Sequence, residues 1–243
     1  MQRGIELETL KVRRSTEEKP RIGVDLDGVV FASFEKVRSI ANRRNGTKVP
    51  YHQLKDYNIH NCMPGSSAEQ ISEIFNYLWL KHPEEIKLID SAIPKTLRAL
   101  RRHFEVNITT AAGKGSEQVY PNIIRLLREN RISYDNLFHV RSLEEKISLG
   151  LDIYFEDDFR IHELARMKQH VILMPQPWVI EYLKNNPASQ DRDLMIKPHP
   201  SDLKKLNGSL YGETAKGISI LPGDNLEEAW RNIRILMLQG LKR

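Results

Sequence analysis

The sequence predicts an α/β fold in which a parallel sheet carries a helical insertion. Short apolar runs that end in polar or acidic residues alternate along the chain with stretches of helical period. Strands that alternate with helices favour a parallel sheet. A long and largely helical interval also separates the first two predicted strands, and this interval indicates an insertion over the strand ends.

The first elements follow a polar tail, residues 1–20. The apolar run at 21–24 predicts a buried strand. The predicted cap insertion spans residues 32–93, with one helix over 32–45 and another over 67–85. The second of these has an apolar stripe of helical period, and a loop rich in glycine and proline joins the two helices.

The core is expected to comprise residues 21–31 and 94–200, with the insertion between them. Pro94 opens a predicted helix at its first position, where proline is favoured. A C-terminal extension, residues 201–243, is expected to end in a helix from about 226 to 241. The remaining predicted core elements are helices over 95–103, 116–130 and 160–168, and strands over 104–109, 137–140, 153–155 and 171–174.

The composition is that of a soluble globular protein, with 40% apolar and 28% charged residues. A run of about 18 apolar residues would indicate a membrane span, and none is present. The N-terminus lacks an apolar signal core, so a cytoplasmic protein is expected. The single cysteine, Cys62, excludes an internal disulfide and fits a reducing compartment.

The net charge of +5 permits a nucleic-acid partner, but the pattern of charges favours a small anion. The basic residues stand in short scattered groups without the interleaved aromatic residues of single-strand binding proteins. A modest positive field attracts small anionic substrates such as phosphate esters. We therefore expect a small phosphate-ester partner, and neither nucleic acid nor a membrane.

Two aspartates, Asp25 and Asp27, follow the first predicted strand in RIGVDLDGVVF. Ligands of open α/β sheets bind at the carboxyl ends of strands, and two acids there need a cation or a proton to offset their repulsion. One carboxylate can attack phosphorus while the other handles the proton of the leaving group. A simple turn is the alternative, whereas a calcium EF-hand is excluded because Val29 and Lys36 occupy ligand positions.

A second acidic group, Glu156-Asp157-Asp158, follows another apolar strand. Because a parallel sheet brings its strand ends together, Asp25 and Asp157 could share one divalent ion. Oxygen ligands favour Mg²⁺ over zinc or copper. The candidate metal ligands are Asp25, Asp27, Glu156 and Asp157.

A threonine pair and a lysine are further candidate site residues. The pair Thr109-Thr110 ends a predicted strand, where a hydroxyl beside backbone N–H groups can hold a phosphate oxygen. A threonine chosen for its β propensity is the alternative there. Surface lysines are common, so Lys146 is singled out only by its position at the start of the segment that leads into the acidic strand.

In order, DLDGVV, NITTAA, Lys146 and YFEDD resemble the four motifs of haloacid-dehalogenase (HAD) phosphatases. The segments LKDYNIHN, AIPKTLRALR and VILMPQPW further resemble the 5′(3′)-deoxyribonucleotidases, the deoxy type C 5′-nucleotidases. The resemblance covers about residues 21–180 and implies a HAD-like Rossmannoid core with a helical cap.

The resemblance also implies a role for each candidate residue, with Mg²⁺ as the cofactor. Thr110 is preferred over Thr109 in the second motif, and Ala112 stands where the family often has arginine or proline. The implied reaction is hydrolysis of a phosphate monoester through an aspartyl-phosphate. The implied roles are nucleophile for Asp25, general acid/base for Asp27, phosphate-binding hydroxyl for Thr110, third-motif lysine for Lys146 and metal ligand for Asp157.

The expected function is therefore a Mg²⁺-dependent 5′-nucleotidase acting on (deoxy)nucleoside monophosphates. The cap aromatics that could face a base are Tyr57, Phe75, Tyr77 and Trp79, and of these Tyr77 and Trp79 fall partly off the apolar stripe. The alternatives are a sugar-phosphate phosphatase, a catalytically silent HAD-fold binding protein and a nucleic-acid 3′-phosphatase. The intact set of acids argues against a catalytically silent protein. The predicted cap would obstruct a long polymer, which argues against a nucleic-acid 3′-phosphatase.

Overall fold

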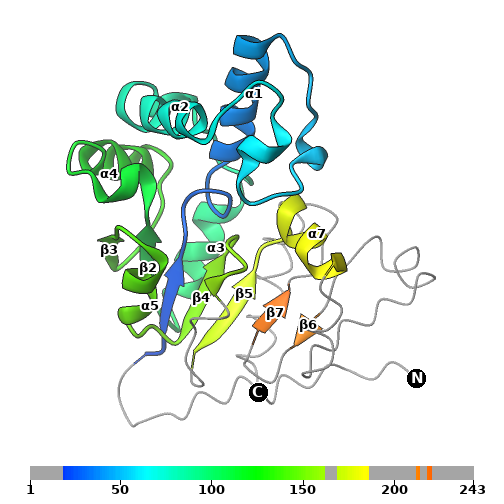
Figure 1. The fold of residues 1–243 in the computed structure, drawn as a ribbon. Coiled ribbons are helices and arrows are strands. Elements are labelled where there is room, and N and C mark those ends of the chain that lie inside the picture. Colours follow the sequence, from blue (N-terminus) through cyan, green and yellow to red (C-terminus); the bar gives the residue numbers. More distant parts are fainter. Residues whose placement is uncertain (1–18, 162–168, 186–211, 214–217, 221–243) are drawn as a thin grey trace.

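The computed structural model describes residues 19–161, 169–185, 212–213 and 218–220. Its centre is a sheet with the strand order β3-β2-β1-β4-β5-β7-β6 (Figure 1). All neighbouring strands pair in parallel except β6 and β7. The strands are β1 (Arg21–Val24), β2 (Glu105–Thr110), β3 (Asn136–His139), β4 (Ile153–Glu156), β5 (His170–Leu173), β6 (Gly212–Glu213) and β7 (Ile218–Ile220).

The central strands form where the sequence has continuous apolar runs. Ile22 and Val24 of β1 are fully buried, and Tyr154 and Phe155 of the neighbouring β4 are buried as well. Parallel strands covered on both faces show such runs rather than an alternating pattern. The register pairs Val24 with Phe155, so the acidic residues that follow these two strands emerge side by side.

Along the chain, each described α-helix lies between two strands of the sheet (Figure 1). Helix α2 begins with a capping box, in which Ser67 and Gln70 satisfy each other's backbone N–H groups. The α-helices are α1 (Ser33–Asn45), α2 (Ala68–Lys81), α3 (Ile93–Leu100), α4 (Tyr120–Glu129), α5 (Leu143–Ser148) and α7 (Pro177–Asn185). The 3₁₀ turns are η2 (Tyr51–Gln53), η3 (Ile59–Cys62), η4 (Pro83–Glu85) and η5 (Ala112–Gly115).

The helical segment, residues 32–93, places α1 and α2 beyond the carboxyl ends of the central strands (Figure 1). Its two connections to the core run next to each other. The N–H of Ala32 donates to the carbonyl of Lys87 at 2.8 Å, and the N–H of Ile89 donates to the carbonyl of Val30 at 3.0 Å. The segment therefore leaves and re-enters the core at one place, as an insertion does. Its division from the core as a separate domain stays a prediction.

The predicted fold class is confirmed as an α/β core built on a largely parallel sheet. The predicted helix over 67–85 is too long, because α2 ends at Lys81 and a separate 3₁₀ turn begins at Pro83. Proline lacks the N–H that the helix would need and restricts the residue before it. Helices α5 and α7 were not predicted, nor were the two strands after residue 200.

Some expectations fall outside the described residues. These are the tail up to residue 18, most of the helix expected over 160–168 and the helix expected near the C-terminus. Among the described residues, no helix combines the length and the apolar character that a membrane crossing requires.

Candidate active site

The loop after β1 turns tightly and brings one acidic loop against another. The carbonyl of Leu26 accepts from the N–H groups of Val30 and Phe31, at 3.0 and 2.8 Å. Gly28 has φ 74°, in the left-handed region that favours glycine. A Cβ at Gly28 would lie 2.3 Å from Oδ2 of Asp157. The glycine therefore permits both the turn and the close approach of the loop after β4.

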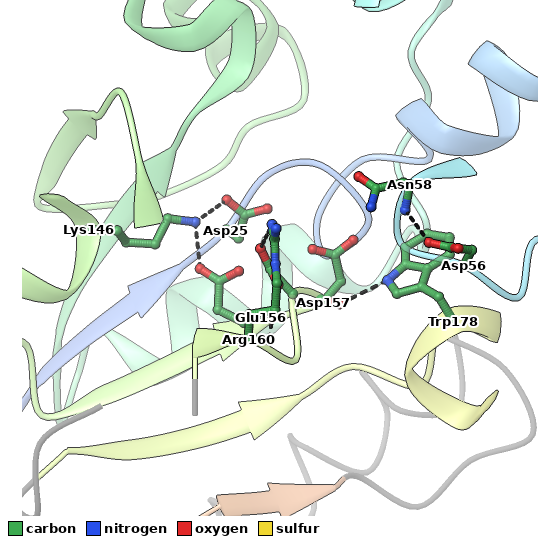
Figure 2. A network of polar contacts seen from close by, with 9 residues as sticks. Asp25, Asp56, Asn58, Lys146, Glu156, Asp157, Arg160 and Trp178 are labelled. Atoms are coloured by element: carbon green, nitrogen blue, oxygen red, sulfur yellow. Dashed lines mark hydrogen bonds and ion pairs between the residues drawn. The ribbon is translucent and has the colours of Figure 1, made fainter. Parts of the chain in front are cut away.

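Three buried carboxylates meet at the ends of β1 and β4, and we call them the acidic cluster. One oxygen from each of Asp25, Glu156 and Asp157 lies within 4.8 Å of the others. Lys146, from α5, reaches between two of them: its Nζ lies 2.7 Å from Oδ1 of Asp25 and 2.5 Å from Oε1 of Glu156 (Figure 2). The sequence-predicted Asp25, Lys146, Glu156 and Asp157 are thus brought together.

The third member of the acidic cluster has no such cation. Oδ2 of Asp157 is buried without a hydrogen-bond partner among the described residues. Burial raises the pKa of Asp157 well above its usual value, and the charges of Asp25 and Glu156 raise it further. The buried acidic cluster therefore has three carboxylates and only one neighbouring ammonium among the described residues, so its negative charge is not balanced.

The pKa values of Asp25 and Glu156, the two carboxylates that Lys146 bridges, show the same shortage of positive charge. Burial raises the pKa of Glu156 to about 8, although Lys146 acts to lower it. Burial also raises the pKa of Asp25, again against the attraction of Lys146. Burial alone would lower the pKa of Lys146, but Asp25 and Glu156 raise it above its ordinary value, so this lysine stays charged.

A Mg²⁺ ion fits the acidic cluster. Its donors are all carboxylate oxygens, which Mg²⁺ prefers, and a divalent ion would supply the missing charge. The neighbouring Asp158 differs, because Arg160 donates to both of its oxygens, at 2.8 and 2.6 Å. The unpartnered Oδ2 therefore favours Asp157 over Asp158 as the ligand.

Asp27 is not part of the acidic cluster and is half-buried. Its Oδ1 accepts a hydrogen bond from Nε1 of Trp79 at 3.2 Å. Burial raises the pKa of Asp27 to about 7, with a further rise from the charge of Asp25. A carboxyl group with a pKa near neutrality can both give and take a proton. As a metal ligand, Asp27 stays a prediction.

The two threonines lie at the end of β2, beside β1, and both are fully buried. Oγ1 of Thr110 accepts from the N–H of Ala112 at 3.1 Å, whereas Oγ1 of Thr109 has no partner among the described residues. The residues of this strand end that line the cavity are Ala111, Ala112 and Gly113. The choice of Thr110 as the phosphate-binding hydroxyl therefore stays a prediction.

A cavity of about 430 Å³ separates the strand ends from the helical segment. This volume is in the range of small-molecule sites, about 300–1,000 Å³. Its floor includes Asp25, Asp27, Lys146, Glu156 and Asp157. The wall formed by the helical segment is lined by Phe34, Tyr57, Asn58, Ile59, His60, Ala68, Ile71, Ser72, Phe75, Asn76 and Trp79.

Of the aromatic residues considered from the sequence, Tyr57, Phe75 and Trp79 line the cavity. The expectation for Tyr77 is wrong: its side chain is 45% exposed, and its hydroxyl contacts Nε2 of His82 at 2.7 Å. The reason is helical period, since Phe75 and Trp79 are four residues apart and share a face, while Tyr77 between them faces outward.

Sequence reasoning missed Arg141 and Arg160, which also line the cavity. Both follow strands of the sheet, Arg141 after β3 and Arg160 after β4. The rule that ligands bind at the carboxyl ends of parallel strands would have pointed to both. Arg160 is paired with Asp158 and also lies over the ring of Tyr57, 4.5 Å from its centre.

Comparison with known proteins gives only distant similarity. No protein-family model matches the chain, and no curated protein matches it. Similar solved structures include a predicted phosphatase from Clostridium acetobutylicum, with 17% identity, 70% of this chain and 91% of that chain covered, and a TM-score of 0.46. A predicted phosphoglycolate phosphatase from Haemophilus somnus has 12% identity, 72% and 94% coverage, and a TM-score of 0.43.

A haloacid dehalogenase-like family hydrolase from Xanthomonas campestris has 14% identity, 73% and 97% coverage, and a TM-score of 0.40. At these identities and scores, the similarities assign neither a family nor an activity to this chain.

Proposed function

We propose that the protein is a Mg²⁺-dependent phosphomonoesterase of the HAD type with Asp25 as its nucleophile. The observation that carries the proposal is the acidic cluster. Lys146 bridges Asp25 and Glu156, while Asp157 is buried beside them without a partner among the described residues. This arrangement opens on a cavity of small-molecule size.

Charge explains why the site suits phosphate only with a metal ion present. A phosphate ester is anionic, and the acidic cluster already carries more negative charge than Lys146 offsets. Asp25, Asp157 and Glu156 would hold Mg²⁺. When bound, the ion neutralises the repulsion between the carboxylate and the phosphate and stabilises charge that develops during transfer.

The residues of the chain divide the remaining work. Lys146 holds Oδ1 of Asp25, which fixes the carboxylate and leaves its other oxygen to attack phosphorus. Backbone N–H groups of residues 111 and 113, with the hydroxyl of Thr110, would hold the phosphate oxygens. Asp27 protonates the leaving oxygen as the ester bond breaks, and then takes a proton from the water that hydrolyses the aspartyl-phosphate.

For the substrate we propose a nucleoside monophosphate, and among these a deoxynucleotide. Tyr57, Phe75 and Trp79 line the cavity and offer aromatic surface to a base. Stacking on one aromatic side chain contributes on the order of 1–3 kcal/mol. The amides of Asn58 and Asn76 line the same wall and suit hydrogen bonds to a base. The cavity volume of about 430 Å³ suits a small ester better than a nucleic-acid strand.

One assay tests both levels of the proposal. Hydrolysis of dUMP, dTMP, UMP, AMP, a hexose phosphate and a triose phosphate is measured with Mg²⁺ and with a chelator. We expect Mg²⁺-dependent hydrolysis with the highest kcat/KM for a deoxynucleotide. A sugar phosphate preferred by about tenfold or more, which is larger than one added methylene in a pocket typically gives, would remove the nucleotidase proposal and leave the phosphatase. A folded protein that hydrolyses none of these esters would contradict both.

A further inference from the structure

The helical segment makes a hydrogen bond to the proposed proton-transfer residue. Trp79, on α2, is fully buried, and its Nε1 donates to Oδ1 of Asp27 at 3.2 Å. An indole has a single N–H and no acceptor, so its only hydrogen bond here goes to Asp27. The bond joins residues that are 52 positions apart and belong to the core and to the helical segment.

The indole is itself held on two sides. Its ring meets the ring of Phe31 edge to face, with centroids 6.3 Å apart and planes at 82°. Asn122, from α4, donates to the backbone carbonyls of Trp79 and Leu80, at 2.8 and 3.1 Å. These carbonyls lie in the last turn of α2, where they lack partners within the helix. The core thus contacts the indole ring through Phe31 and anchors the backbone that carries it through Asn122.

We propose that Trp79 is the positioning residue for Asp27, an inference that rests on the proposed phosphatase function. By donating to Oδ1, the indole restrains the carboxyl group of Asp27 and favours the proton on Oδ2. That proton passes to the ester oxygen as the bond between phosphorus and oxygen breaks, and the bonding electrons remain on that oxygen. Proton transfer depends on such alignment.

The test separates proton delivery from substrate binding, because Trp79 also lines the cavity. Purified Trp79→Phe and wild-type protein are compared, with Mg²⁺, on para-substituted phenyl phosphates of similar size whose phenols rise in pKa. We expect kcat/KM of the variant to fall by roughly tenfold or more on the least acidic phenol, where acid assistance matters most. The loss should shrink toward none on the most acidic nitrophenol. An equal loss across the series, or a change in KM alone, would overturn the positioning role.

Trp178→Phe is the matched control. This second buried indole donates to the backbone carbonyl of Asp157 at 2.9 Å, on the other acidic loop. Its removal costs a comparable bond near the same site, and we expect a loss of similar size on every ester of the series. A leaving-group dependence as steep as that of Trp79→Phe would show that any disturbance here has this effect, and would contradict a specific role for Trp79.

Two further variants keep the test decisive. Site-specific replacement of Trp79 by benzothienylalanine keeps the ring volume without the N–H, and should give the same leaving-group dependence even if Trp79→Phe fails to fold. Asn122→Ala should give a weaker form of it, and no such dependence would contradict the anchoring through α4. A wild type that hydrolyses the series together with a uniform loss in the variants would overturn only the positioning role. An inactive wild type would overturn the proposed function as well.

Discussion

The unpartnered carboxylate of Asp157 leads to a prediction in which removing a charge stabilises the metal-free protein. Its Oδ2 is buried beside Asp25 and Glu156 without a hydrogen-bond partner among the described residues. Asparagine keeps the shape, and its amide can donate to the neighbouring carboxylates. A buried polar group left unsatisfied costs about 1–3 kcal/mol. We therefore expect metal-free Asp157→Asn to be more stable than wild type by about that amount.

Mg²⁺ should reverse this order. An ion present at about 100 times its Kd stabilises the folded state by about 2.7 kcal/mol. Wild type should gain this free energy of unfolding, whereas Asp157→Asn should gain little. Asp158→Asn is the control, since Asp158 is paired with a half-exposed Arg160. Its stability should fall in both conditions, because the buried Asp158 accepts three hydrogen bonds from Arg160, and its gain from Mg²⁺ should be kept.

The measurement is urea unfolding of the three proteins, each with a chelator and with MgCl₂. Stabilisation of Asp157→Asn without metal, together with its loss of the Mg²⁺ gain, would support the role of Asp157 as a ligand. If Asp157→Asn is destabilised without metal and still gains stability from Mg²⁺, the reasoning is refuted. If Asp158→Asn instead loses the stabilisation by Mg²⁺, the metal ligand is Asp158 and not Asp157.

Three other predictions follow from the same geometry. Lys146→Met leaves buried carboxylates unpaired, so it should abolish turnover and lower the free energy of unfolding by about 3–5 kcal/mol. Lys36→Met removes a more exposed ion pair and should lower it by no more than about 1 kcal/mol. Equal losses of the two variants in urea unfolding would contradict this. Asp27→Asn should impair hydrolysis of sugar phosphates more than of aryl phosphates, and similar kcat/KM losses on both would remove its acid role. The pKa of Glu156 is raised from 4.5 to about 8, so the folded state binds more protons in that range and metal-free stability should fall as pH rises through it. Urea unfolding at several pH values tests this, and a rise with pH would contradict it.

The sequence was sufficient to predict the central strands and the acidic residues at their carboxyl ends. Buried parallel strands are continuous apolar runs, so β1 and β4 were predicted within a residue. Because their carboxyl ends share one edge, the meeting of Asp25 with Asp157 also followed from the pattern alone. The position of the acidic cluster at the ends of these strands could therefore be predicted without knowledge of long-range packing.

Other features depend on contacts that no local pattern encodes. The choice between Asp157 and Asp158 rests on which carboxylate Arg160 reaches, and the contact of Trp79 with Asp27 depends on how the helical segment packs on the core. The outward position of Tyr77 was predictable, because the helical period that places Trp79 toward the cavity excludes its neighbour two residues away. Strand β7 was missed because its segment, Ile-Ser-Ile, has only two apolar residues and is interrupted by a serine.

The most direct test of the central claim is chemical trapping of the phosphorylated residue. Turnover of the best substrate with Mg²⁺ is stopped by acid, and borohydride then reduces any aspartyl-phosphate to homoserine. Mass spectrometry of the peptide that contains both Asp25 and Asp27 locates the change. The account predicts homoserine at position 25, only with both substrate and Mg²⁺ present, and none in Asp25→Asn, which should not turn over. Homoserine at position 27, or sustained turnover by Asp25→Asn, would contradict it.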